Sequence, residues 1–478
     1  MMKNLGGRAR LTVLLALVLG LTVSMATPAT GASQRREAPP AGAGSPWRVE
    51  PTPNAIAWRR GVLNADSCAS ATACTAVGSY ENTAGNVSTL ALDRRGGTWH
   101  RQATPNPPGT IRSVLSAVSC SSAGACIAVG RFFRAVGHSF KGSVRPLAEG
   151  WNGRSWRIEA TPSPVGDSGA RFYAISCSSK LDCTAVGYFT GHSGADAALA
   201  ESWNGRNWRV LATPRPPGAT STWLYGVSCT SASACTAVGA DQGRTGTFPL
   251  AERWNGTSWQ IQPPAGPAPG SLSAVSCSSA RSCVAVGPFG GRNGTVPLAE
   301  AWNGRAWHVR PVPNPAGSTG SQLLAVSCSS PAACTAVGGY GSSRGQTLPL
   351  TERWNGTSWQ IQNAPDPAGT ISSQLSGVSC PSAATCTSAG NYGVFYQQTL
   401  TLVETWAART WRIQPTPTPT GAATSALSAL SCFSPAACTA VGWFSNGAGN
   451  SLTLAERWNG TSWQAQRTPN PPQNLRLN

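Results

Sequence analysis

Three observations predict that this sequence folds as an all-β protein, a β-propeller of eight four-stranded blades. A motif of Ser-Cys, five residues, Cys and Ala-Val-Gly, as in residues 115–130, occurs eight times, about every 52 residues. Each copy is followed by a segment similar to residues 250–262 (LAERWNGTSWQIQ) and then by a Pro-rich connector. Each repeat therefore holds four short strand-like segments, which is the size of a propeller blade.

The first two segments of a repeat flank the cysteine pair, and the last two flank a tight turn. In the second repeat Asn152-Gly153 follows Trp151. Asn-Gly between strands is a strong hairpin signal because both residues tolerate the positive φ of a type I′ turn. The same dipeptide begins at Asn204, Asn255, Asn303, Asn355 and Asn459, whereas Arg95-Gly96 and Ala407-Ala408 take its place in repeats one and seven.

The distribution of residue sizes favours a closed ring over a linear stack. The first two segments are rich in Ser, Ala, Val and Gly, and the last two carry paired tryptophans such as Trp254 and Trp259. Blades crowd at the axis and splay at the rim, so small residues suit the inside. A ninth Trp-led segment precedes the repeats, and we expect residues 47–50 to pair with the last blade and close the ring. Seven blades, nine blades and an open array remain alternatives.

The sixteen cysteines are predicted to form eight local disulfides. A hairpin brings two such positions to the Cα separation that a disulfide requires, and each short loop closed contributes roughly 2 kcal/mol. Zinc sites favour closer cysteines with a second ligand pair, and the four histidines do not repeat with the cysteines, so we expect neither a metal nor a cofactor. The predicted pairs are Cys68–Cys74, Cys120–Cys126, Cys177–Cys183, Cys229–Cys235, Cys277–Cys283, Cys328–Cys334, Cys380–Cys386 and Cys432–Cys438.

The N-terminal segment predicts export. Lys3, Arg8 and Arg10 precede an apolar run and small-residue cleavage sites after Ala26 or Ala32, which is the layout of a secretory signal peptide. The run is too short for a membrane span, and no second one follows. We therefore expect a signal peptide over residues 1–32, a Pro/Gly-rich linker over 33–46, the propeller over 47–466 and a tail over 467–478. The mature protein is expected to be a secreted monomer, with association with the cell wall as an option.

The net charge of +18 limits the classes of partner. An exported basic protein can attract anionic wall polymers, acidic polysaccharides or phosphate-bearing surfaces, and no specific nucleic acid is expected. The plainer interpretation is an arginine excess that reflects genomic base composition on a solvated face.

The repeat resembles known propeller families. The order of Trp, turn, Trp, Pro-rich connector and Gly-ended strand resembles kelch repeats of the galactose oxidase fold, and residues 254–259 (WNGTSW) are similar to the Asp-box hairpin of sialidase-type propellers. The whole unit looks most like secreted actinobacterial repeat proteins of no assigned activity. Most repeats lack the kelch double glycine, with Gly338-Gly339 an exception, and Trp254 occupies the Asp-box aspartate position. The resemblance implies a fold and not an activity.

No catalytic pattern of these families is recognised. A copper radical oxidase would need two His, two Tyr and an unpaired Cys, and a sialidase would need an Arg triad with a Tyr/Glu pair. No GxSxG, HExxH or P-loop pattern occurs either. A glutamate recurs in seven repeats, and we expect it to hold blades together by a hydrogen bond or salt bridge, because glycoside hydrolysis needs only one acid and one base. These residues are Glu149, Glu201, Glu252, Glu300, Glu352, Glu404 and Glu456.

An aromatic residue also recurs, two positions after the glycine of the second segment. Packing at the strand end is the favoured interpretation, and a ring of stacking platforms is the alternative. The aromatic residues are Tyr80, Phe132, Phe189, Phe289, Tyr340, Tyr392 and Phe444.

A ligand site is expected where the repeat symmetry breaks, because the fold already explains the repeated residues. Residues 131–146 form a long basic loop, two adjacent repeats carry Tyr in place of a strand-one Ser, and one repeat has Asp in place of the recurring aromatic. The hypothesis is an aromatic and basic ligand surface, and neutral drift in loops is the alternative. Its residues are Arg131, Arg134, His138, Tyr173, Trp223, Tyr225 and Asp241. Asp66, where other repeats have an aliphatic residue, is interpreted as degeneracy of the first repeat rather than as a site.

These patterns favour a secreted, non-catalytic binding or scaffold protein. Carbohydrate or cell-wall polymer is the leading ligand class, and another exported protein is next. The alternative class is an extracellular hydrolase or lyase that acts on polysaccharides from a propeller scaffold. A carboxylate pair facing the axis would favour the enzyme, whereas an aromatic face without one would favour binding.

Overall fold

The computed structural model describes residues 58–134, 144–164, 166–263, 265–266, 269–291, 294–394 and 398–469. The chain divides into a unit Met1–Pro46 and a unit Trp47–Asn478, and the description below concerns the second. The predicted signal peptide and linker, the closing strand at residues 47–50 and most of the predicted tail lie outside the described residues.

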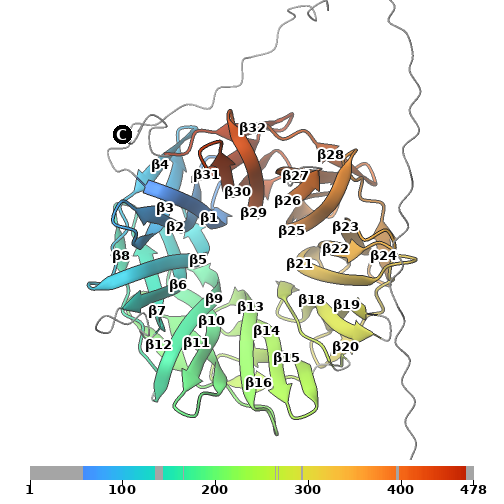
Figure 1. Cartoon of the computed structure of the whole chain (residues 1–478). Helices are drawn as coiled ribbons and strands as arrows, with labels where there is room; N and C mark the ends of the chain where they lie inside the picture. Colours follow the sequence, from blue (N-terminus) through green and yellow to red (C-terminus); the bar gives the residue numbers. More distant parts are fainter. Residues whose placement is uncertain are drawn as a thin grey trace, which may run out of the picture. The chain divides into compact units, whose positions relative to one another are not determined.

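Within the described residues, thirty-two strands form eight consecutive groups of four, and each group comes from one repeat (Figure 1). Blades one to four comprise β1 (Trp58–Cys68), β2 (Cys74–Asn82), β3 (Val87–Arg95), β4 (Thr98–Gln102); β5 (Thr110–Ser122), β6 (Ala125–Arg134), β7 (Val144–Trp151), β8 (Trp156–Ile158); β9 (Asp167–Ser179), β10 (Asp182–Gly191), β11 (Asp196–Trp203), β12 (Trp208–Leu211); and β13 (Ser221–Ser231), β14 (Ala234–Gly243), β15 (Gly246–Trp254), β16 (Trp259–Ile261).

Blades five to eight repeat this pattern with similar strand lengths. They comprise β17 (Ala274–Ser279), β18 (Ser282–Gly291), β19 (Gly294–Trp302), β20 (Trp307–Val309); β21 (Gly320–Ser330), β22 (Ala333–Gly341), β23 (Thr347–Trp354), β24 (Trp359–Gln362); β25 (Thr370–Ser382), β26 (Thr385–Val394), β27 (Gln398–Ala407), β28 (Thr410–Gln414); and β29 (Ala422–Ser434), β30 (Ala437–Asn446), β31 (Ser451–Trp458), β32 (Trp463–Gln466). The prediction of eight four-stranded blades is confirmed.

The blades close into a ring with the first strand of each blade innermost. Within a blade, consecutive strands pair antiparallel, and the first strands of successive blades contact one another around the whole ring, β29 with β1 included (Figure 1). At the seam between blades eight and one, Leu63 and Ala76 share a core cluster with Val441 and Ala455. Each of these two blades takes its four described strands from its own repeat, and side-by-side packing together with one parallel backbone bridge, between Arg60 of β1 and Ser451 of β31, joins them.

A close backbone contact sets the register of the two inner strands. In blade three, a Cβ at Gly187 would lie 1.9 Å from the carbonyl oxygen of Arg171, so only glycine fits. The pairing of β9 with β10 shifts by one residue at this point, between Phe172 and Ala174. Tyr173 is therefore the extra residue of a β-bulge. Blade four has the same arrangement, with Gly239 opposite Leu224 and Tyr225 as the extra residue of β13.

The eight predicted disulfides are all confirmed, and the structure contains no free cysteine among the cysteines of the described residues. In blade three, Cys177 and Cys183 are Cα partners across the β9–β10 hairpin, 3.9 Å apart. Cys183 is also the Cα partner of Trp203, which begins the β11–β12 hairpin. We call the end of the blades with these two hairpins the disulfide face. The opposite end, with the strand-two/strand-three hairpins and the connectors, is the connector face.

The Trp hairpins differ from the predicted turn type. Asn152 has no positive φ, and its Oδ1 accepts hydrogen bonds from the N–H groups of Arg154 and Ser155 at 2.9 and 3.0 Å. Because the side chain satisfies these N–H groups, the Trp151–Trp156 pair is closed by a four-residue loop rather than a type I′ turn. The two repeats without Asn-Gly do have consecutive positive φ values, at Gly96-Gly97 and Ala408-Arg409.

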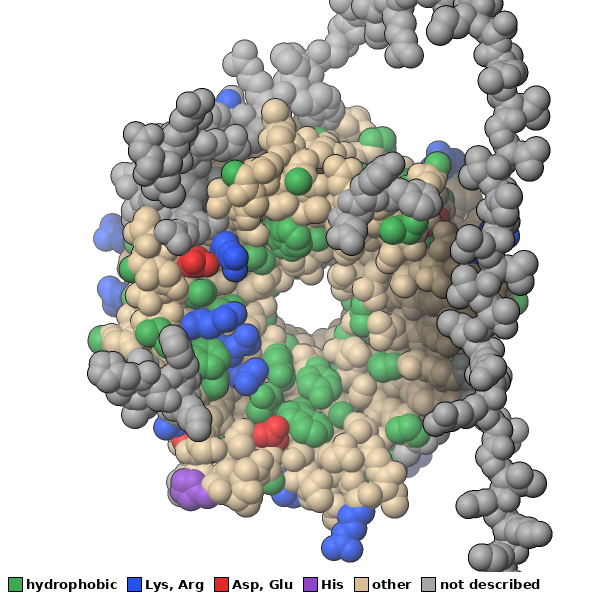
Figure 2. All heavy atoms as spheres, viewed as in Figure 1, with side chains coloured by type: hydrophobic (Ala, Val, Ile, Leu, Met, Phe, Trp, Pro, Cys, Tyr) green, Lys and Arg blue, Asp and Glu red, His purple; other side chains and the backbone are tan. Residues whose placement is uncertain are grey.

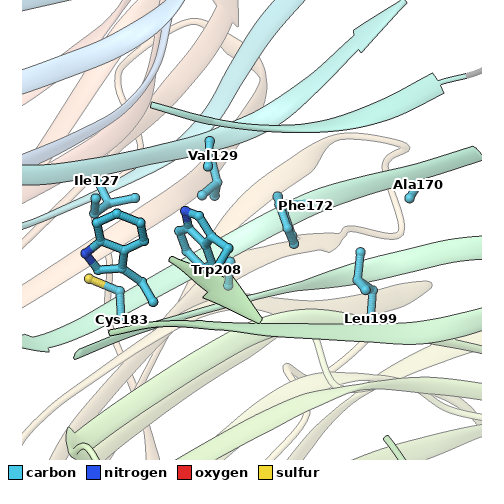
Figure 3. Packing of buried hydrophobic residues seen from close by; sticks show 10 residues of the cluster. Ile127, Val129, Ala170, Phe172, Cys183, Leu199 and Trp208 are labelled. Carbon is cyan, nitrogen blue, oxygen red and sulfur yellow. The ribbon is translucent and has the colours of Figure 1, made fainter. Parts of the chain in front are cut away.

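The tryptophans of these hairpins fill the space between blades, as predicted. Trp208 of blade three is 5% exposed, and its ring centroid lies 6.2 Å from that of Phe172. Ile127 and Val129 of blade two belong to the same cluster (Figure 3). Each such pair of neighbouring blades thus shares one continuous apolar core.

The recurring glutamates form no salt bridge within the described residues, and the predicted alternative, a hydrogen bond that holds neighbouring blades together, is present at Glu300. Glu252 is fully buried with both carboxylate oxygens unpartnered among the described residues, whereas Glu300 accepts backbone hydrogen bonds from Ala265 and Gly266 at 2.9 and 3.2 Å. The arginine next to Glu252 cannot pair with it, because successive strand residues face opposite sides of a sheet. Arg253 instead lies over Trp302 of the next blade, 4.5 Å from its ring centroid.

The first prediction concerns one disulfide. Replacing Cys177 and Cys183 with serine should lower the free energy of unfolding by about 2 kcal/mol, because the open loop gains entropy in the unfolded chain. Denaturant unfolding followed by tryptophan fluorescence measures the change. The same exchange at Cys277 and Cys283 opens a loop of equal length and should give an equal effect. An unchanged unfolding midpoint in both variants would contradict a stabilising role.

The second prediction concerns pH. Burial raises the pKa of Glu252 and of Glu352 from 4.5 to about 8. The folded state therefore holds more protons than the unfolded state between these two values, and stability should fall as pH rises from about 4.5 to about 8. Melting temperatures across this range check the sign. E252Q/E352Q should make the profile less steep, because Glu149, Glu201, Glu404 and Glu456 keep pKa values raised to about 8. E81Q, which removes a carboxylate beside Arg60, should leave the profile unchanged.

Candidate binding site on the connector face

The two bulge tyrosines, Tyr173 and Tyr225, contact each other across the boundary between blades three and four, beside the central axis. The ring of Tyr173 lies 5.8 Å from that of Tyr225 in blade four, edge-on, and 5.8 Å from that of Tyr188 in its own blade. All three side chains are half-buried. The other blades carry smaller or aliphatic residues at the bulge, so this aromatic group is unique to blades three and four within the described residues. The residues at the corresponding position of the other six blades are Asn64, Ser116, Ser273, Leu324, Ser376 and Ser428.

Two arginines lie beside the tyrosines. The guanidinium of Arg171 is 5.0 Å from the ring centroid of Tyr188, a cation–π contact. Arg131 of blade two is half-buried, and its Nε has no hydrogen-bond partner among the described residues. Burial and then the positive charges of Arg171 and Arg112 lower the pKa of Arg131. Like charges in a partly buried place are unfavourable without a counter-charge, so this group is electrostatically suited to an anion.

Trp223 is fixed in place at the edge of this group. Its Nε1 donates to the Oδ2 of Asp196 at 2.8 Å, and the Oδ1 of Asp196 accepts from the hydroxyl of Thr190 at 2.7 Å. Burial, with smaller contributions from Tyr173 and Asp196, raises the pKa of the Tyr225 phenol. The Asp196 carboxylate thus holds Trp223 in place.

We call the group formed by Arg131, Arg171, Tyr173, Tyr188 and Tyr225 the Tyr–Arg cluster. Figure 2, viewed as Figure 1, shows Lys and Arg side chains on one side of the central opening, next to hydrophobic side chains along its rim. The combination offers flat apolar rings and guanidinium groups within one surface.

The structure brings together four residues of the hypothesised surface: Arg131, Tyr173, Tyr225 and, at the edge, Trp223. Arg134 is exposed at the end of β6 and lies over Phe132, 5.5 Å from its ring centroid. Asp241 lies apart, in a pocket described below, and His138 falls outside the described residues.

Sequence reasoning missed Arg171, Tyr188 and Asp196. A signal for Tyr188 was present, because it follows the strand-two glycine just as Arg131 does in the preceding repeat. Arg171 and Asp196 gave no comparable signal, since their roles depend on contacts with the bulge and with the next blade.

The recurring aromatic residues pack at the strand ends, which is the interpretation that the sequence favoured. Phe189 joins the core between blades two and three, and Phe444 is 5% exposed in the core of blade eight.

Asp66 lies on β1 at the seam with blade eight. Burial raises the pKa of Asp66 well above its usual value, against a smaller lowering by the backbone of Ser431. In the described part of the chain, no group of three or more His, Cys, Asp or Glu side chains is arranged to hold a metal ion. Nor do the described residues include a helix of the length and apolarity that a membrane span requires.

Comparisons with known proteins concern the fold. No protein-family model and no curated protein matches the sequence. Solved structures that resemble the chain include YCF48 bound to D1 peptide, with 14% identity, a TM-score of 0.39 and coverage of 73% of this chain and 94% of that one. Chaetomium thermophilum Sqt1 bound to the N-terminus of the ribosomal protein L10 has 9% identity, a TM-score of 0.49 and coverage of 83% and 98%. A polysaccharide lyase, an ulvan lyase, has 9% identity, a TM-score of 0.45 and coverage of 87% and 100%. These distant likenesses carry no argument about function.

Proposed function

We propose that the protein is a secreted, non-catalytic binding module that holds an anionic carbohydrate polymer, such as a cell-wall polysaccharide, at the Tyr–Arg cluster. The observation that carries this proposal is the half-buried Arg131, with an unpartnered Nε, beside Arg171 and three tyrosine rings. Guanidinium groups bind carboxylates, sulfates and phosphates through paired hydrogen bonds. Tyrosine rings offer apolar faces to sugar rings and hydroxyls at their edges.

Three further observations support this function. Eight disulfides suit an oxidising compartment, in agreement with the signal peptide that the sequence predicts. The Trp hairpins, Pro-rich connectors and Gly-ended strands support a relation to secreted bacterial repeats of the kelch or Asp-box kind. The carboxylate beside the cluster, Asp196, is hydrogen-bonded to Trp223 and Thr190, which favours binding over hydrolysis.

The third prediction tests the charge of the site. R131Q/R171Q should weaken binding of polygalacturonate at least about tenfold, because hydrogen bonds between charged groups contribute roughly 1.5–3 kcal/mol. Isothermal titration measures the affinity, with dextran as the neutral polymer. The matched control is R209Q/R412Q, which removes two exposed arginines, one from blade three and one from blade seven. Equal losses in the two variants would mean that net charge, and not this cluster, attracts the polymer.

The dependence of binding on salt concentration distinguishes the contribution of the arginines from that of the tyrosine rings. Attraction to exposed arginines weakens as ionic strength rises, whereas ring contacts persist. Y173A should therefore lose the binding that survives high salt, with the fold checked by its thermal transition. If neither polymer binds under any salt condition, the proposed ligand class is wrong and an exported protein becomes the leading partner.

A further inference from the structure

Blade four departs from the other seven at the recurring aromatic position. Asp241 occupies it on β14, and the residue opposite on β15 is Phe248. The other seven blades have the aromatic on strand two and a non-aromatic residue on strand three, which is aliphatic in blades three and five to eight, as in Tyr340 opposite Leu348. The aromatic ring has thus changed strands, and a carboxylate stands where a ring would fill the space between blades.

This exchange leaves a pocket on the side of blade four that faces the preceding connector. The pocket has a volume of about 530 Å³, and its walls include Pro216, Pro217, Phe248 and Pro249 around Asp241. The corresponding pocket of blade three, where Phe189 is present, measures about 310 Å³. A volume of this size is ordinary for a small-molecule site, and its walls are mostly apolar.

Backbone contacts hold the frame of the pocket from both sides. The N–H of Thr220, in the preceding connector, donates to the carbonyl of Gln242 at 2.6 Å. The N–H of Gly270, in the following connector, donates to the carbonyl of Thr247 at 2.9 Å. Within the hairpin, the Thr247 hydroxyl donates to the Oε1 of Gln242 at 2.9 Å. A fixed frame lowers the entropy cost of binding.

Asp241 brings an uncompensated negative group to this pocket. The residue is 8% exposed and forms no ion pair within the described part of the chain. Arg244, the other charged wall residue, is exposed to solvent at the mouth. Burial raises the pKa of Asp241. A carboxylate in apolar surroundings is costly unless a cation accompanies it.

We propose that this pocket binds an organic ammonium ion with a small apolar body. The carboxylate of Asp241 would accept hydrogen bonds from the ammonium group, and the ring of Phe248 can offer its negative face to the same charge. The proline rings would enclose the apolar body. This site is separate from the Tyr–Arg cluster, takes a ligand of opposite charge, and does not depend on the function proposed above.

The fourth prediction tests the site with three probes of similar shape: benzylammonium, benzyl alcohol and benzoate. Isothermal titration at neutral pH should show binding of benzylammonium only. D241N keeps the shape but removes the charge, and it should weaken that binding at least tenfold. E81Q removes a carboxylate from blade one and is the matched control, with no effect expected.

A second variant keeps the test decisive if D241N fails to fold. D241F restores the aromatic residue of the other seven blades, so it should fold at least as stably as the parent and abolish binding by filling the pocket. Equal binding of benzyl alcohol, binding undiminished in D241F, or no binding of benzylammonium at millimolar concentration would each overturn the proposal.

Discussion

In every blade the second strand passes so close to the innermost strand that a side chain larger than hydrogen cannot be placed there. At this contact the innermost strand either forms a β-bulge or is held by irregular backbone hydrogen bonds. Because the glycine has no side chain, the narrow side of each blade presents only backbone there. Wide tryptophan pairs then fill the outer side. The taper of the blades depends on this contact, and so do the closure of the ring and the position of the residues that face the axis. The glycines are Gly78, Gly130, Gly187, Gly239, Gly287, Gly338, Gly390 and Gly442.

The bulge also explains where variation can produce a site. An extra residue at the bulge has no partner across the ladder, so its side chain is free of the packing that fixes its neighbours. The bulge residue is a serine in blades two and seven, at Ser116 and Ser376, whereas Tyr173 and Tyr225 contact each other across a blade boundary. The repeat keeps the fold constant while single positions change chemistry, which is how a symmetric scaffold can carry an asymmetric surface.

Much of the architecture could be predicted from the sequence because each repeat states the same pattern again. Cysteine spacing gave the disulfides, and residue size gave the closed ring. The turn type at Asn152 was wrong because the side-chain oxygen caps the loop, a local competition that a dipeptide rule does not include. Glu252 forms neither the hydrogen bond nor the salt bridge expected of the recurring glutamates within the described residues, and strand alternation directs the neighbouring Arg253 to the next blade.

The candidate site was only partly predictable for a similar reason. Tyr173 and Tyr225 were visible as departures from a repeated serine, but Arg171 and Asp196 matter through neighbours that only the folded ring supplies. Asp241 was visible as a departure too, yet its pocket with Phe248 depends on pairing across β14 and β15. A break in a repeat therefore indicates where to look, and packing decides which breaks act together.

All eight disulfides join cysteines six positions apart, each within one hairpin. In a chain that crosses a membrane from its N-terminus onward, each cysteine meets its correct partner before the next pair emerges. For an exported chain, oxidation would then follow the order of translocation and would need little reshuffling by an isomerase, although sixteen thiols can in principle combine in a very large number of ways. Short-range pairing thus limits scrambled bridges wherever the thiols are oxidised.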